Sequence, residues 1–368
     1  MKTEKAFYIV IVTGLILSCT SFGSFSPNWV WDDYPYSDFG WHIAQTPDGT
    51  KLVVGSRLTA GLVGGCVAVF NWQSDIPIYK RTFSDDPVET VAISDDGSVV
   101  ACAVPGMLYV TTSTGEPMWE HDISSDGYPL SLDFDPSGDL LVLSVDDGIG
   151  RTRGRIVLFD GISGERYWTD VPEQFGVPGA QIIRKIQISN DSQWLMGVAT
   201  GINTPGPGFI VMYNLLGPEP DDPVYIVEFN NRASVYHSDL ALTAENFVVN
   251  GSTWLEYHDF SIPVDDVKPP LWELDGGGYP GIRSRCAISD DGSIVAYHGA
   301  GLDNTDGHAR VFRGSDGLEL WSTITDFRST EVDVSGDGTR VAYSGSLLDY
   351  PYTQGRTLIW DGSINDML

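Results

Sequence analysis

Basic residues are scarce in this sequence. Its 368 residues include 21 lysines and arginines against 50 aspartates and glutamates, which gives a formal net charge of -29. A surface this acidic repels the phosphate backbone, so we exclude nucleic acid as a partner of the surface as a whole. The acidity is compatible with colloidal stability and with a salt-rich habitat, and the sequence does not separate the two.

Cysteine and catalytic signatures are also scarce. Apart from Cys19, the cysteines are Cys66, Cys102 and Cys286, which lie among apolar neighbours on expected strands. None has the spacing of a metal ligand, so we predict buried free thiols, with a Cys66–Cys102 disulfide between adjacent repeats as the alternative. There is no Gly-x-Ser-x-Gly elbow, His-Glu-x-x-His helix or phosphate-binding loop. The sequence therefore favours a protein that is not an enzyme, without excluding one.

A long apolar run is missing as well. The run from Ala6 to Leu17 is too short for a membrane span, but it follows Lys2 and Lys5 in the layout of a secretory signal. We predict a signal segment at 1–24 and a single domain at 25–368. Ile16-Leu-Ser-Cys19 resembles the lipobox of bacterial lipoproteins, which would make Cys19 a lipidated first residue; otherwise cleavage falls a few residues later. The expected location is extracellular, periplasmic or on the cell surface, with membrane contact only through such a lipid.

No long segment shows a helical period, and a strand-turn-strand phrase recurs instead. Its clearest copy is Ile288-Ser-Asp-Asp-Gly-Ser-Ile-Val-Ala, two apolar runs around an Asp-Gly turn. The turn positions of the copies are Gly49, Gly97, Gly138, Ser192, Glu245, Gly292 and Gly338, at steps of 41 to 54 residues. Such a period with strand content throughout is typical of a β-propeller with one four-stranded blade per repeat. We therefore predict an all-β, seven-bladed propeller.

The two ends of the chain complement each other. We name the strands of a repeat a to d, from the innermost to the outermost. The last repeat reaches strand c at Leu358-Ile-Trp360 and lacks a strand d, while Pro27-Asn-Trp-Val-Trp-Asp32 reads like the strand d of another repeat. We predict that this N-terminal segment supplies the outer strand of the last blade, with Val30 near Ile359, so that the ring is closed and its edges are protected.

The repeats resemble known families. The Ser-Asp-Asp-Gly hairpins are similar to those of WD-repeat propellers, and endings such as Ser163-Gly-Glu-Arg-Tyr-Trp168 are similar to pyrroloquinoline-quinone-type repeats. The resemblance covers roughly residues 27 to 362 and implies a blade, not an activity. It brings no counterpart of the quinoprotein cofactor contacts, so we expect no cofactor. A propeller lipoprotein of outer-membrane assembly has a similar layout of lipobox and repeats.

The candidate site lies on one face of the predicted disc. The a–b and c–d turns are short and form the turn face, whereas the b–c and d–a loops are long and variable and form the loop face, where binding usually resides. The candidate ligand-binding residues at the loop-face mouth are Trp41, Glu89, Tyr128, Arg184, Lys185, His237, Tyr279, Arg283, Arg285 and Arg328. Arginine suits a carboxylate, phosphate or sulfate ligand, although local acids such as Asp146 could pair with these arginines instead. Asp303 and Asp306 form a weak calcium candidate, and we otherwise expect no metal and assign no catalytic residue.

Propellers host scaffolds, receptors and enzymes alike. The sequence favours an exported, monomeric binding or scaffold module that takes a protein or an anionic small molecule on the loop face. The alternative is a cell-envelope enzyme that acts on a carbohydrate or a lactone at the channel mouth, and carboxyl groups of raised pKa gathered there would favour it.

Overall fold

The computed structural model describes residues 29–31, 38–58, 64–146, 154–170, 181–201, 208–217, 220, 223–229, 239–243, 245–251, 254–259, 270–275, 285–300, 307–325, 327–347 and 355–361. Over these ranges the regular structure is antiparallel strand. The described residues contain no helix that is long and apolar enough to cross a membrane.

The strands follow one another as short meanders. The first part of the chain forms β1 (Trp29–Trp31), β2 (Asp38–Gln45), β3 (Lys51–Leu58), β4 (Gly65–Asn71), β5 (Tyr79–Phe83), β6 (Thr90–Ile93), β7 (Val99–Val104), β8 (Met107–Thr112), β9 (Pro117–Asp122), β10 (Tyr128–Phe134), β11 (Leu140–Asp146), β12 (Gly154–Asp160) and β13 (Arg166–Asp170). The second part forms β14 (Gln181–Ile188), β15 (Trp194–Gly201), β16 (Gly208–Asn214), β17 (Pro223–Phe229), β18 (Asp239–Leu242), β19 (Asn246–Gly251), β20 (Trp254–Asp259), β21 (Trp272–Asp275), β22 (Arg285–Ile288), β23 (Ile294–Ala300), β24 (Gly307–Arg313), β25 (Glu319–Thr325), β26 (Phe327–Val334), β27 (Arg340–Leu347) and β28 (Gly355–Asp361).

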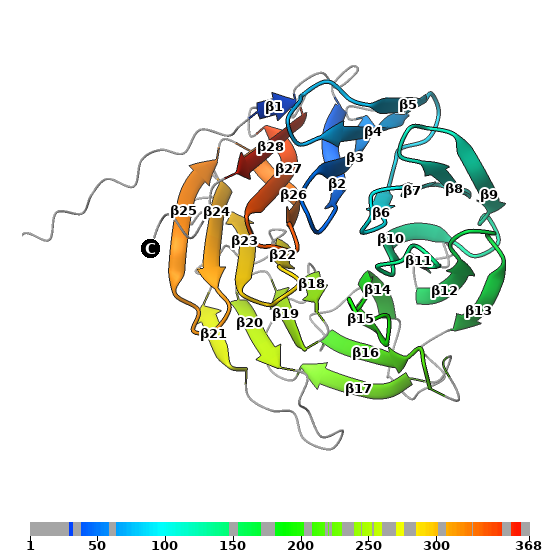
Figure 1. Ribbon diagram of the computed structural model, residues 1–368. Coiled ribbons are helices and arrows are strands. Elements are labelled where there is room, and N and C mark those ends of the chain that lie inside the picture. The colour runs from blue at the N-terminus through cyan, green and yellow to red at the C-terminus, as the bar shows by residue number, and fades with distance from the viewer. Residues whose placement is uncertain are drawn as a thin grey trace, which may run out of the picture.

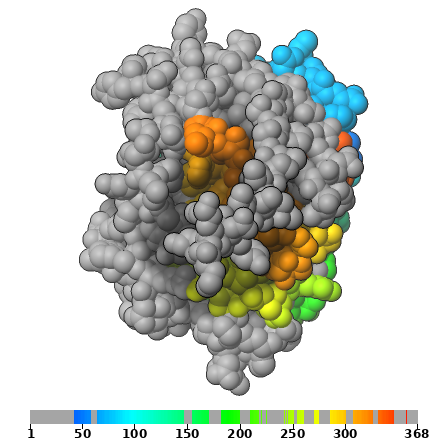
Figure 2. Space-filling view, turned by 90° about the vertical axis from the view of Figure 1, so that its left-hand side faces the viewer, coloured from blue at the N-terminus to red at the C-terminus, as the bar shows by residue number. Residues whose placement is uncertain are grey.

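These strands pair into four-stranded sheets that stand like blades around a central axis (Figure 1). Within the described residues the sheets are β2–β5, β6–β9, β10–β13, β14–β17, β18–β21, β22–β25, and a seventh with the order β1-β28-β27-β26. In each sheet the innermost strand is a strand a, and β2, β6, β10, β14, β18, β22 and β26 together surround the axis. Seen from the rim in Figure 2, the surface coloured orange belongs to β24 and β25, the outer strands of one blade.

The N-terminal strand closes the ring. In the antiparallel pair of β1 with β28, Trp29 lies opposite Ile359 and Val30 lies opposite Leu358. The predicted pairing of the two chain ends is therefore confirmed. β1 covers the middle of the outer edge of β28, from Thr357 to Ile359, so this stretch of backbone is not open to another chain.

The a–b turns are held by a repeated hydrogen-bond pattern. The Ser94 hydroxyl donates to the Asp96 carboxylate over 2.7 Å, and the same oxygen accepts from the backbone N–H of Ser98 over 2.8 Å. The next residue, Gly97, has a φ of 66°, a left-handed conformation that glycine adopts without strain. The turn serine and aspartate recur at Ser189 and Asp191, where Ser192 takes the left-handed place with a φ of 57°.

Tryptophan joins neighbouring blades on the outside. Trp119 of β9 packs on Phe159 of β12, and its indole N–H donates to the carbonyl of Gly161 over 2.8 Å. Trp119 therefore anchors one blade to the next by packing and by a hydrogen bond. Trp272 repeats the bond with the Gly314 carbonyl over 2.5 Å.

The three cysteines in the described part of the chain are free and buried, as predicted, so the alternative disulfide does not form.

Candidate functional site

Bulges in the inner strands set which side chains face the axis. The pairing register shifts between Gly40 and His42 in β2, and between Ile183 and Lys185 in β14. The same shift occurs before Ser131 in β10 and before Glu331 in β26. A bulge leaves one extra residue unpaired and re-aims the side chains that follow it. The residue that follows each bulge lies four positions before the first residue of the a–b turn, which is a serine, a threonine or an aspartate. These residues are therefore at the same level of the channel: His42, Ser131, Lys185 and Glu331.

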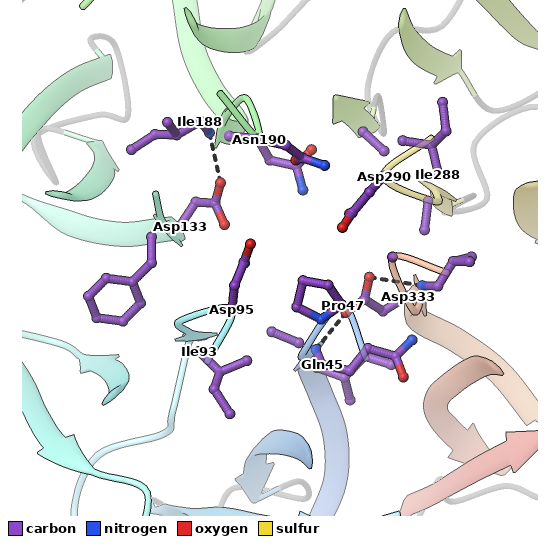
Figure 3. A pocket seen from close by; sticks show the side chains of 18 of the residues that line it. Gln45, Pro47, Ile93, Asp95, Asp133, Ile188, Asn190, Ile288, Asp290 and Asp333 are labelled. Atoms are coloured by element: carbon purple, nitrogen blue, oxygen red, sulfur yellow. Dashed lines mark hydrogen bonds between the residues drawn. The ribbon is translucent and has the colours of Figure 1, made fainter. Parts of the chain in front are cut away.

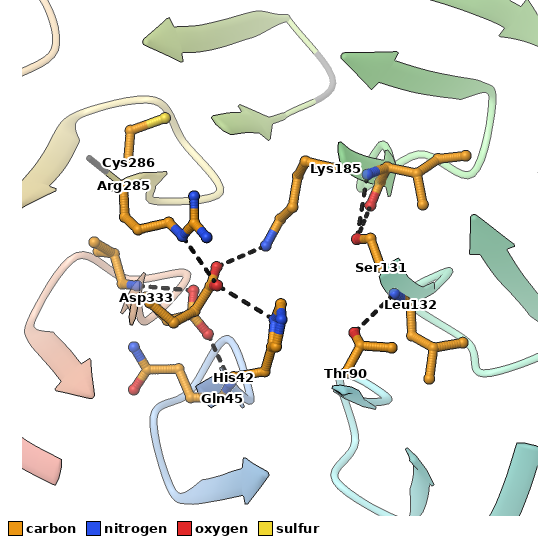
Figure 4. Close-up of polar contacts among 12 residues, drawn as sticks. His42, Gln45, Thr90, Ser131, Leu132, Lys185, Arg285, Cys286 and Asp333 are labelled. Atoms are coloured by element: carbon orange, nitrogen blue, oxygen red, sulfur yellow. Dashed lines mark hydrogen bonds and ion pairs between the residues drawn. The ribbon is translucent and has the colours of Figure 1, made fainter. Parts of the chain in front are cut away.

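A buried ionic cluster occupies this level (Figure 4). Glu331 is 1% exposed. Its carboxylate lies 2.9 Å from the Lys185 ammonium, 3.5 Å from Nε of Arg285 and 3.3 Å from Nδ1 of His42. These four side chains, which we call the Glu331 cluster, come from β26, β14, β22 and β2, so the contacts join blades across the channel.

Towards the turn face the channel becomes acidic. A cavity of about 120 Å³ lies among the last residues of the inner strands and the first residues of the a–b turns. Its carboxylates are Asp95, Asp133, Asp290 and Asp333, each from a different blade, and they point towards the axis in Figure 3. We call this space the acidic mouth.

Backbone groups of neighbouring blades fix two of these carboxylates. Asp133 accepts from the backbone N–H of Ile188 over 2.7 Å, and Asp333 accepts from that of Gln45 over the same distance. Asp333 also accepts from the N–H of Val334 over 2.9 Å. The two side chains are thus held in place by the fold.

The ionisation of these carboxyls is shifted towards the neutral acid. Burial raises the pKa of Asp133 to about 8, against the opposing effects of the Ile188 N–H and the Lys185 charge. Burial likewise raises the pKa of Asp333 to about 7. Burial and the nearby Asp290 raise the pKa of Asp95 to about 6. Without a further cation, carboxyls at this mouth are therefore partly protonated near neutral pH.

The predicted site residues separate into two groups. Lys185 and Arg285 meet in the Glu331 cluster. Glu89 and Tyr128 meet elsewhere, where the Tyr128 hydroxyl donates to Glu89 and Arg57 lies 3.6 Å from the same carboxylate. This pairing with Arg57 matches the alternative that local acids engage the arginines.

Two of the residues predicted at the loop-face mouth, Trp41 and Arg184, are the extra residues of the bulges in β2 and β14. The following residues, His42 and Lys185, supply the side chains of the Glu331 cluster.

Several predicted residues cannot be compared with the structure. The side chains of Trp41 on β2 and Arg328 on β26 lie outside the described part of the chain, as do Cys19, His237, Tyr279, Arg283, Asp303 and Asp306 entirely.

Sequence reasoning missed the central residues of both regions. Neither Glu331 nor His42 is among the residues that the sequence predicted for the site. Asp133 and Asp333 were missed although their positions hold alanine in other repeats, such as Ala44. A polar residue where a repeat otherwise places alanine was the available signal.

Comparison with known proteins identifies the fold. No protein-family model matches the chain, and no curated protein matches it. Among solved structures it is similar to the β-propeller domain of Swd1 (Cps50) from Myceliophteria thermophila, at 12% identity over 90% of this chain and 98% of that one, with a TM-score of 0.63. It is also similar to hydrazine synthase of Kuenenia stuttgartiensis, at 12% identity over 91% and 97% with a TM-score of 0.65. The WD40 repeats of RRP9 match at 12% identity over 89% and 96%, with a TM-score of 0.62. At this identity the likeness shows the fold alone: the chain is a β-propeller with WD40 propellers among its structural neighbours.

Proposed function

We propose that this protein is an exported binding or scaffold module that takes an anionic group, from a partner protein or a small molecule, on the loop-face side of its channel. The observation that carries the proposal is the Glu331 cluster. Lys185 and Arg285 bring two permanent positive charges to one carboxylate, and His42 adds a group that is charged when protonated.

The charge balance of the cluster favours an additional anion. Two cations held in a partly desolvated channel attract a carboxylate or phosphate more strongly than they would in water. The side chains of Arg285 and Lys185 are 15% and 18% exposed, so neither is fully sealed from solvent. Arginine also offers several N–H donors in a fixed arrangement that matches carboxylate and phosphate oxygens.

The predicted signal at 1–24 motivates the export part of the proposal. Fractionation of a host that expresses the full chain would test it. Appearance of a shortened chain outside the cytoplasm is the expected result, with labelling at Cys19 if the lipobox is used. A full-length chain that stays in the cytoplasm would contradict export.

Thermal unfolding against carboxylates, phosphate and sulfate would test the anion site. A ligand at a hundred times its dissociation constant adds about 2.7 kcal/mol to the free energy of unfolding. We expect Lys185→Met and Arg285→Met to remove the shift and Arg285→Lys to keep part of it, because lysine retains the charge. Lys80→Met on the outer strand β5 is the matched control and should leave the shift intact. Equal shifts in all variants would contradict the proposal.

The acidic mouth gives the enzyme alternative an observation of its own. With a pKa of about 8, Asp133 is mostly protonated at neutral pH, whereas Asp95, with a pKa of about 6, is mostly ionised. A proton donor beside a carboxylate is the pairing that glycoside or lactone hydrolysis uses. Hydrolysis of a chromogenic glycoside or lactone, lost in Asp133→Asn, would support an enzyme; no turnover across such a panel would favour the binding module.

A further inference from the structure

The lining of the acidic mouth includes one side-chain acceptor and one side-chain donor that lack a hydrogen-bond partner among the described residues. Gln187 lines the cavity, and its buried side-chain oxygen accepts no hydrogen bond from the described residues. The buried side-chain nitrogen of Gln45, also in the lining, finds no acceptor among them, and a backbone carbonyl of a bound segment could supply one. A buried polar atom that lacks a partner costs free energy, so such atoms point to a group that completes the site.

The charges of the mouth are also unbalanced. Four carboxyl groups line the cavity, whereas its lining includes one cationic side chain, that of Lys185. The Lys185 ammonium also lies 2.9 Å from the carboxylate of Glu331, so its charge is shared with a fifth carboxylate. In the described residues no three carboxylate, histidine or cysteine side chains are placed to hold one metal ion. An organic cation fits better, because the N–H groups of an ammonium or guanidinium can reach acceptors on several sides.

The turn face around the mouth carries two more features. Exposed aspartates occur on the a–b turns of several blades. Each lies two residues after the turn serine or threonine: Asp48, Asp96, Asp191, Asp291 and Asp337. Farther out, the c–d connections of several blades expose large apolar side chains: Ile76 (73%), Ile162 (51%), Leu216 (73%), Leu271 (56%) and Leu318 (49%). These are single apolar side chains on the outer connections of separate blades, which we call the rim, and together with the acidic centre they suit a basic segment that also carries apolar residues.

We propose that the turn face docks a basic segment of a partner protein, and that a lysine or arginine side chain of this segment enters the channel between Asp95, Asp133, Asp290 and Asp333. This site opens towards the opposite mouth from the loop-face site, and Lys185, which contacts Glu331 and also lines the acidic cavity, lies between the two. The apolar rim favours a protein segment over a free polyamine, because a polyamine would leave the rim uncovered.

The binding of such a cation is linked to pH. An ammonium near the carboxyls favours their charged forms, so it displaces the protons that burial keeps on Asp95, Asp133 and Asp333. Affinity therefore rises between about pH 6 and pH 8, and protons are released on binding. The other charged groups near these carboxyls are Lys185, Glu331, Asp290, Asp96 and Asp135.

Calorimetric titration of the full chain with three capped peptides tests the proposal. The probe is acetyl-Leu-Ala-Ala-Lys-Ala-Ala-Leu-amide, compared with the same peptide carrying arginine or norleucine in place of lysine. We expect the lysine or the arginine peptide to bind at least tenfold more tightly than the norleucine peptide, and more tightly at pH 8 than at pH 6. Asp95→Asn and Asp290→Asn, which each remove one carboxylate from the cavity lining, should each weaken binding about tenfold.

Two controls separate this site from general acidity. Asp139→Asn removes an exposed carboxylate that does not line the cavity and should leave the affinity unchanged. Leu216→Ser on the rim should weaken the peptide but not spermidine. Equal affinity for the norleucine peptide, binding of spermidine or calcium without binding of either basic peptide, or no binding of any probe would each overturn the proposal.

Discussion

Replacing Glu331 by glutamine is the most direct test of how the channel is held together. The substitution keeps the shape of the side chain but leaves Lys185 and Arg285 without their shared carboxylate, 2.9 and 3.5 Å away. Removing one partner of a buried ion pair costs about 3–5 kcal/mol, because the remaining charge stays desolvated. Glu331 is 1% exposed, so solvent does little to screen this loss.

The expected change is measurable by calorimetry or by thermal unfolding. For a chain of 368 residues the unfolding entropy is about 0.8 kcal/mol per degree, so Tm should fall by about 4–6 °C. The double variant Glu331→Gln with Lys185→Met should recover part of the loss, because it removes one of the two cations that face Glu331. The reasoning fails if Glu331→Gln leaves Tm unchanged. It also fails if the double variant loses as much stability as the two single variants together, because the ions then do not act as a unit.

Three further predictions concern the mouth, the blade contacts and the ring closure. The pKa of Asp133 is higher in the folded than in the unfolded protein, so its contribution to stability is fully present below about pH 4 and is lost as the pH rises to about 8. In denaturant titrations, Asp133→Asn should therefore stabilise the protein by about 1–3 kcal/mol more at pH 8 than at pH 5. An equal effect of the substitution at both pH values would contradict this. Gly164 has a φ of 75°, and Gly164→Ala places a Cβ 2.7 Å from the Trp119 ring. The matched control is Gly106→Ala, where φ is 84° and the atom nearest to the new Cβ is 3.9 Å away. Gly164→Ala should lower the free energy of unfolding by about 1–3 kcal/mol more than the control, and equal losses would show that the ring moves freely. A chain that lacks β1 (Trp29–Trp31) exposes the edge of β28 and should associate in light scattering, whereas a chain that begins at residue 25 should not.

The repeat carried most of the information about the fold. A serine or threonine, an aspartate and a glycine at fixed spacing specify a hairpin through local hydrogen bonds and one left-handed residue, so this element is readable from the sequence. The fit of the N-terminal segment to the last repeat predicted the β1–β28 pairing for the same reason. These features depend on residues close together in the chain or on a pattern that repeats.

The channel required the tertiary structure. Lys185 and Glu331 are 146 residues apart, and they meet because two strands approach the same axis from different blades. The bulge before each of them shifts the alternation of inward and outward side chains by one residue. The pattern of apolar and polar residues in these strands does not indicate that shift. The sequence by itself therefore determined the repeated hairpins and the pairing of the chain ends. Only the tertiary structure decided which side chains face the axis, because burial and charge there arise from strands brought together around a ring.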